Sequence, residues 1–173
     1  VLRLRLFLVL LTFLWYLAVA IPVLLVMALL VGYLFLTAEV QAAAISAQGI
    51  SAGNDPDAFE QLKNAVTEGT FQGTLYQKPL EWKDASEYVY LTYTLRIRNN
   101  CLVPIDMIEV QVVPQSTDIL QMGDFAVHSL QAKTEGDITV RVLAPKDTHP
   151  VREIIVTYYV WGVSFNLKTT YGG

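Results

Sequence analysis

Cysteine and histidine are scarce in this 173-residue chain. The one cysteine, Cys101, excludes an internal disulfide, and we expect it to be a small apolar core residue. The two histidines, His128 and His149, stand far apart and in no spacing typical of metal ligands. The sequence therefore predicts no metal site and no cofactor.

Patterns that carry catalysis are also missing. No serine lies in a G-x-S-x-G turn, no glycine-rich loop is suited to a phosphate, and no D-x-D-x-D-G loop is suited to calcium. We therefore expect no catalytic residues and a protein that is not an enzyme. One alternative stays open, a hydrolase acting on cell-envelope polymers, because two acids that meet only in space leave no sequence pattern.

Charge is absent from Leu6 to Ala38, whereas all sixteen acidic and ten of the twelve basic residues lie beyond this run. A helix needs about 20 apolar residues to cross the ~30 Å hydrocarbon core of a bilayer. We expect residues 1–38 to form a transmembrane anchor helix, with the lipid bilayer as a partner. Aromatic side chains are predicted to lie at headgroup level at three positions: Trp15, Tyr16 and Tyr33.

The flanks of the apolar run predict its orientation. Arg3 and Arg5 precede it, and no further basic residue follows until Lys63. Positive charge near a span stays on the cytoplasmic side of the membrane. We therefore expect a cytoplasmic amino terminus in the cell membrane and an extracytoplasmic chain from Glu39 onward.

The run has three interpretations. Ala18-Val19-Ala20 fits the cleavage site of a signal peptide, although apolar sequence continues to Leu36. Alternatively, Pro22 separates two short spans. We favour one long helix, loosened near Pro22, because a membrane helix tolerates the lost hydrogen bond. Its excess length over a bilayer predicts that a protein partner packs against it.

Ala20-Ile21-Pro22 also resembles the proline step in the long amino-terminal helix of type IV pilin-like subunits. The resemblance covers residues 1–35 and implies a structural subunit whose helix packs in a filament core. Arg5 departs from this pattern, since pilins usually carry a glutamate near the start of the helix. A pilin-like filament subunit is therefore an alternative function.

Residues 39–69 are predicted to form a helical stalk followed by a short helix. The alanines between Glu39 and Gln48 favour a continuation of the anchor helix. Asp55-Pro56 is typical of a helix start, because aspartate caps the first amides and proline fits the first turn. Gly69 is expected to end that helix.

From residue 70 to residue 173, apolar side chains recur at every second position. In Val89–Ile97 they alternate with polar residues, as in a half-buried strand, and similar runs surround Val110, Val140 and Val156. About seven short strands with regular turns are typical of an immunoglobulin-like sandwich. We therefore predict a mainly β fold: an N-terminal transmembrane helix, one short helix, and an antiparallel Ig-like β-sandwich over residues 70–173.

The segment Tyr93–Val113, with Asn99-Asn100 at its turn, resembles the opening of bacterial surface Ig-like domains. The resemblance implies a membrane-anchored surface protein and brings no active site with it. Beyond the anchor, ten basic and sixteen acidic residues leave a net charge of −6. That balance argues against a nucleic-acid partner, which needs clustered lysine and arginine.

Aromatic residues mark the expected contact surface of this domain. Alternation places Tyr159 and Trp161 on an outward sheet face, and Tyr88 and Tyr90 join them as candidate partner contacts. Core filling and cross-strand pairing are the alternative roles for these side chains. The leading hypothesis is a single-pass, membrane-anchored extracytoplasmic interaction or accessory protein without catalytic activity. It would bind a protein partner through its membrane helix or a sheet face.

Overall fold

Two compact units make up the chain, one over residues 1–38 and one over residues 39–173. The computed structural model describes residues 2–36, 39–123 and 128–172, and for residues 2–10 and 35 it describes the backbone alone. The first unit is helical and the second is mainly β.

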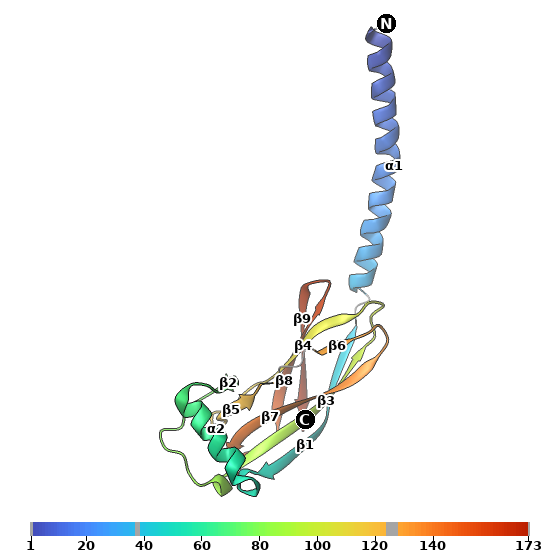
Figure 1. The fold of residues 1–173 in the computed structure, drawn as a ribbon. Helices are drawn as coiled ribbons and strands as arrows, with labels where there is room; N and C mark the ends of the chain where they lie inside the picture. Colours follow the sequence, from blue (N-terminus) through green and yellow to red (C-terminus); the bar gives the residue numbers. More distant parts are fainter. Residues whose placement is uncertain (1, 37–38, 124–127, 173) are drawn as a thin grey trace. The chain divides into compact units, whose positions relative to one another are not determined.

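Helix α1 runs without interruption from Leu2 to Leu36 (Figure 1). At 1.5 Å per residue it is about 52 Å long. Pro22 lies inside it and removes one backbone hydrogen bond without ending the helix. The segment Leu11–Leu34 has a mean hydropathy of 2.7, and no part of it is buried by the rest of the described chain. One continuous helix contradicts the interpretation as two separate spans.

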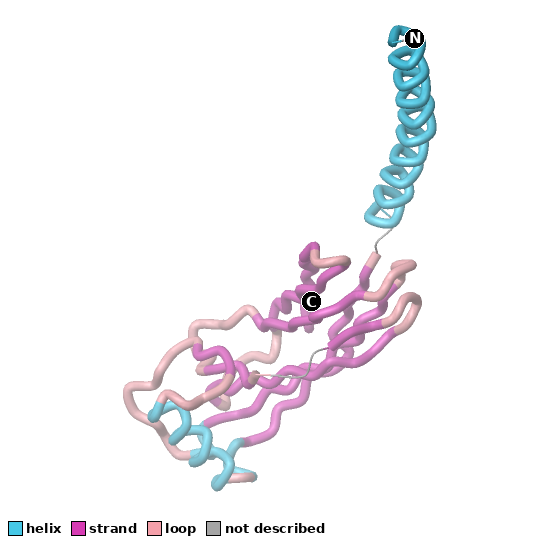
Figure 2. The backbone as a smooth tube through the Cα atoms, turned by 45° about the horizontal axis from the view of Figure 1, so that its top comes forward, coloured by secondary structure: helices cyan, strands magenta, loops and turns pink. Residues whose placement is uncertain are grey.

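Two antiparallel sheets form the second unit, as predicted (Figure 2). The first has the strand order β1-β3-β7-β5-β2 and the second β6-β4-β8-β9. The strands are β1 (Val40–Ser51), β2 (Gly73–Leu75), β3 (Tyr88–Asn99), β4 (Ile105–Val112), β5 (Leu120–Met122), β6 (His128–Leu130), β7 (Glu135–Pro145), β8 (Arg152–Val160) and β9 (Val163–Tyr171). The orders β1-β3-β7-β5 and β4-β8-β9 correspond to the A-B-E-D and C-F-G sheets of an immunoglobulin sandwich.

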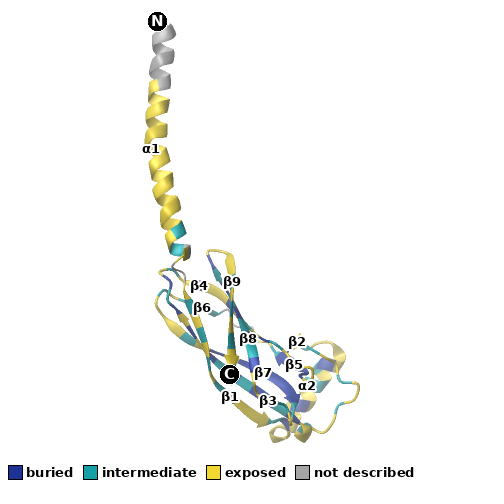
Figure 3. Cartoon of the chain, turned by 180° about the vertical axis from the view of Figure 1, so that it is seen from behind, coloured by how far each residue is buried: buried dark blue, intermediate teal, exposed yellow. Residues whose placement is uncertain are grey.

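The main core lies between the sheets, where alternate residues of the long strands are buried (Figure 3). Its fully buried side chains include Tyr93, Leu95, Ile97, Ile105, Val112, Val142, Ile154 and Val156. Cys101 is buried as well, as expected for a small apolar core residue. The period of two in the sequence therefore marks the inward faces of β3, β4, β7 and β8.

The helical stalk predicted at the start of residues 39–69 is wrong, because residues 40–51 form strand β1. This strand pairs with β3 along its whole length, with a bulge between Ala44 and Ser46. The helix propensity of alanine amounts to less than about 1 kcal/mol per residue, and tertiary context overrides it. Here β3 supplies backbone hydrogen-bond partners throughout. The sandwich therefore begins at Val40 instead of at residue 70.

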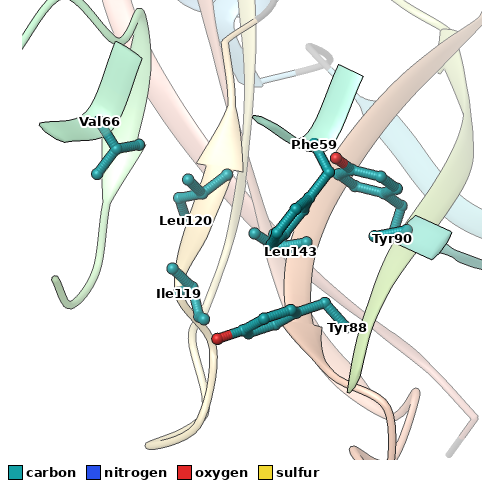
Figure 4. Close-up of a cluster of buried hydrophobic side chains, with 8 residues drawn as sticks. Phe59, Val66, Tyr88, Tyr90, Ile119, Leu120 and Leu143 are labelled. Carbon is teal, nitrogen blue, oxygen red and sulfur yellow. The ribbon is translucent and has the colours of Figure 1, made fainter. Parts of the chain in front are cut away.

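Helix α2 (Pro56–Glu68) confirms the predicted short helix. The Ala58 amide donates to Asp55 Oδ1 at 3.0 Å, and Gly69 ends the helix with a φ of 75°, where a residue without Cβ meets no clash. The apolar side of α2 packs on the outer face of the first sheet and buries Phe59 there (Figure 4). A second, smaller core thus lies outside the sandwich.

Candidate interaction surface

Tyr88 and Tyr90 lie at the start of β3, and only 4% and 9% of their surface is exposed. Phe59 stacks on Tyr88 with 5.2 Å between the ring centroids. The Lys83 amide donates to the Tyr88 hydroxyl at 3.1 Å, and the Arg141 guanidinium lies 5.9 Å from the Tyr90 ring centre. Their burial contradicts the prediction that these two tyrosines form part of an exposed contact face. Both side chains instead fill a hydrophobic core, which is the alternative role considered for them above (Figure 4).

Helix α2 explains this difference. A period of two shows which residues share a face of a strand, but not whether another element covers that face. Because α2 packs over the first half of β3, both faces of this half are buried. Burial also raises the pKa of the Tyr90 phenol above its ordinary value.

Trp161 is a surface residue, as predicted. It lies at the turn between β8 and β9 with 54% of its surface exposed and a φ of 50°, and Gly162 follows with a φ of 77°. Two successive positive φ values are typical of a type I′ hairpin turn, which favours Asn-Gly. Tyr159 is half-buried on β8. The structure thus keeps Trp161 and Tyr159 together on the second sheet, apart from the two buried tyrosines of the first.

Further apolar side chains are exposed at the end of the sandwich where the chain enters β1, which we call the entry end. Three connections meet there (Figure 1): residues 100–104 between β3 and β4, residues 131–134 between β6 and β7, and the Trp161-Gly162 turn. The Asn100 amide donates to the Glu39 carbonyl at 2.9 Å. This bond ties the first described residue of the β unit to the entry end.

Four exposed apolar residues belong to the entry end, and we call them the entry-end apolar group: Leu102 (57% exposed), Met107 (52%), Trp161 (54%) and Val163 (48%). Met107 lies in an irregularity of β4 between Asp106 and Glu109 and has a φ of 50°. Single exposed apolar residues are normal on a protein surface, and the feature that these four share is their place at one end of the sandwich.

The opposite end holds a buried polar network that the sequence analysis missed. Arg152 forms a two-pronged ion pair with Asp118 at 2.7 and 2.9 Å, and both side chains are buried. Arg152 also donates to the carbonyls of His149 and Val151. The sequence held one indication that Arg152 is buried: it lies two residues before the inward-facing Ile154 and therefore on the same face of β8. The network joins two loops and is internally neutralised.

Two phenols, of the half-buried Tyr76 and the buried Tyr93, complete the polar interior. Tyr76 hydrogen-bonds with Gln121 Oε1 at 2.9 Å, and burial, together with the charge of Asp118, raises the pKa of Tyr76 to about 12. The Tyr93 hydroxyl donates to the Pro150 carbonyl at 2.7 Å, and burial raises the pKa of Tyr93 to about 12. Both phenols therefore stay protonated near neutral pH and serve as hydrogen-bond donors within the fold.

A surface hollow with a volume of about 510 Å³ lies at the far end, opposite the entry end. Its charged lining residues are Lys78, Lys83, Lys146, Glu81, Glu87 and Asp147. Because both signs are present in equal number, the hollow offers no single-sign field for a charged ligand. Within the described ranges, no group of three or more His, Cys, Asp or Glu side chains is placed to hold a metal ion.

The aromatic residues predicted for the membrane interface lie on α1. Trp15, Tyr16 and Tyr33 are exposed there, and about 25 Å of helix separates Tyr16 from Tyr33. Arg3 and Arg5 lie in the first turns of α1, where the structure describes the backbone and not the side chains.

No protein-family model matches this chain, and no curated protein matches its sequence. The observations that bear on its function are therefore its fold, its exposed surfaces and the distribution of its charge. These combine an apolar helix with a separately packed β-sandwich, and four of the nine large apolar residues exposed on the described part of that sandwich belong to the entry end.

Proposed function

We propose that this chain is a single-pass membrane protein that holds its β-sandwich on the extracytoplasmic side. The observation that carries this proposal is the segment Leu11–Leu34, with a mean hydropathy of 2.7 and no burial. In water such a helix exposes its whole apolar surface, whereas a bilayer stabilises it. Arg3 and Arg5 precede this apolar segment, and no base follows it until Lys63, which supports a cytoplasmic amino terminus.

The sandwich is proposed to act by binding a protein partner and not by catalysis. Its buried charges neutralise each other within the fold, and the phenols of Tyr76 and Tyr93 have a raised pKa and act as hydrogen-bond donors. The outer face of β4, β8 and β9 bears Tyr159 among polar pairs such as Lys168–Glu153. This face and the apolar surface of α1 are the two routes by which a partner is proposed to bind.

Cysteine accessibility tests the orientation. In a Cys101→Ala background, Asp147→Cys places a thiol in an exposed turn of the sandwich, and Leu2→Cys places one before Arg3. We expect a membrane-impermeant maleimide to label Asp147→Cys on intact cells and Leu2→Cys only after permeabilisation. The reverse pattern contradicts the orientation, and recovery of the chain without membranes contradicts the anchor itself.

Site-specific photocrosslinking tests the interaction role. A photoreactive phenylalanine analogue at Tyr159, or at successive positions of α1, should yield a discrete adduct in membranes extracted with mild detergent. The same analogue at Glu60, an exposed position on α2, is the matched control. A lack of adducts at Tyr159 and along α1 would refute both proposed routes.

A further inference from the structure

We propose that the entry end of the sandwich docks on the headgroup region of the bilayer, with the entry-end apolar group among the lipids. The inference rests on the proposed anchorage by α1 and adds a second membrane contact, made by the β unit. Its ligand is the lipid–water interface, and its lipid-contacting residues are Leu102, Met107, Trp161 and Val163. The contact role predicted for Trp161 is thereby assigned to lipid.

The short connection between the two units supports the lipid–water interface as the ligand of the entry end. Helix α1 ends at Leu36, and Glu39 already accepts a hydrogen bond from Asn100 of the entry end. Three peptide links join Leu36 to Glu39, and a chain of that length spans at most about 11 Å. Once α1 crosses a bilayer, the entry end is therefore held near the membrane surface, with its exposed apolar side chains within reach of lipid.

The backbone at the entry end supports a role for these side chains outside the domain. Among the described residues, three non-glycine residues have a positive φ, namely Met107, Lys133 and Trp161, and all three belong to the entry end. Such conformations are unfavourable for residues with a Cβ and cluster at functional sites. The Trp161 position suits asparagine better on backbone grounds. A tryptophan there, more than half exposed, has the amphipathic ring that membrane interfaces favour.

The charge distribution favours the same end. Five charged residues belong to the entry end and leave a net charge of −1: Glu39, Arg98, Asp106, Lys133 and Glu135. Arg98 and Glu135 pair with each other at 2.8 Å. In contrast, residues 55–87, which include α2, hold seven acidic and three basic residues and a net charge of −4. Anionic headgroups therefore repel the α2 region more strongly than the entry end.

The three tryptophans of the chain provide the test, because each lies in a different region: Trp15 in α1, Trp82 against the α2 cluster and Trp161 at the entry end. Full-length variants that retain one tryptophan, with phenylalanine at the other two positions, are reconstituted in phosphatidylcholine vesicles. A spin-labelled lipid quenches fluorescence just below the headgroups. We expect a loss of Trp161 emission comparable with that of Trp15, and little loss for Trp82.

The outcomes separate this inference from the proposed function. Quenching of Trp15 without quenching of Trp161 overturns docking and leaves the anchor standing. Absence of quenching at both positions overturns the anchor and the docking together. Equal quenching of Trp82 and Trp161 also overturns docking by the entry end, because the far side of the sandwich then meets lipid equally.

A matched pair of charge insertions tests the contact residues. Leu102→Asp, in the Trp161-only variant, places a carboxylate in the entry-end apolar group and should abolish most of the quenching of Trp161. Leu80→Asp introduces the same charge at a fully exposed position beside the far-end hollow and should leave the quenching unchanged. Equal effects of the two substitutions, or no effect of Leu102→Asp, contradict the proposal.

Discussion

Tyr93 offers a pH-dependent test of the packing between the sheets. Its side chain is fully buried, its hydroxyl donates to the Pro150 carbonyl at 2.7 Å, and burial raises its pKa to about 12. An unfolded tyrosine titrates near pH 10, so between about pH 10 and 12 only the unfolded chain releases this proton. The stability that this group contributes is therefore complete below pH 10 and is lost as the pH rises toward 12.

The size of the effect follows from the shift in pKa. Two pKa units correspond to about 2.7 kcal/mol, of which about 1.4 kcal/mol is lost by pH 11. Tyr93→Phe does not titrate, but it lacks one hydrogen bond worth about 1 kcal/mol. The variant should therefore be about 1 kcal/mol less stable than the parent near pH 8. The two should become equally stable near pH 11, and the variant should be the more stable one above that pH.

Urea unfolding of residues 39–173, a separate compact unit, measures this crossing at several pH values. Thr92→Val serves as a control, because neither side chain at that position titrates and its effect on stability should not depend on pH. If Tyr93→Phe has the same deficit near pH 11 as near pH 8, then the Tyr93 phenol does not have the raised pKa described above.

Three further changes probe the interior. Thr92→Val should stabilise the sandwich by about 1 kcal/mol, because the Thr92 hydroxyl is buried and, within the described chain, has no hydrogen-bond partner; a lower urea midpoint contradicts this. Arg152→Leu should cost about 3–5 kcal/mol by leaving Asp118 buried and unpaired, whereas Arg98→Leu at an exposed pair should cost at most about 1 kcal/mol. Equal urea midpoints for these two variants refute the ranking. Phe59→Ala should cost about 3–5 kcal/mol and accelerate hydrogen exchange in α2 more than in β8; uniform acceleration indicates that α2 does not pack as a local unit.

Much of this fold was predictable, because long periodic segments determine their own structure. The apolar run that became α1 admits few folded alternatives, and the alternation in Val89–Ile97 fixes which face of β3 lies between the sheets. The short helix was predictable at both ends, since Asp55-Pro56 and Gly69 act through local backbone chemistry. These features depend on neighbours within a few residues.

The failures depend on partners that are distant in the sequence. Strand β1 is rich in alanine, and only its pairing with β3 makes it a strand. Tyr88 and Tyr90 have outward parity, and only the packing of α2 buries them. The residues around Asp118 do not indicate that it is buried, because its charge is paired with Arg152, which lies 34 residues away in the sequence. Of the predicted contact residues, Tyr159 and Trp161 therefore keep a surface role that experiment can test.

The proposed docking by the entry end requires little binding free energy, because the proposed anchor confines the domain to the membrane surface. A free protein loses an estimated 4–15 kcal/mol of translational and rotational freedom on association, whereas a domain joined to α1 by three peptide links has lost most of that freedom. Partial burial of four apolar side chains, each contributing about 1 kcal/mol, then suffices to orient the sandwich. In this proposed orientation α2 and the far-end hollow point away from lipid, so the part of the sandwich that carries most of its negative charge stays clear of the headgroups.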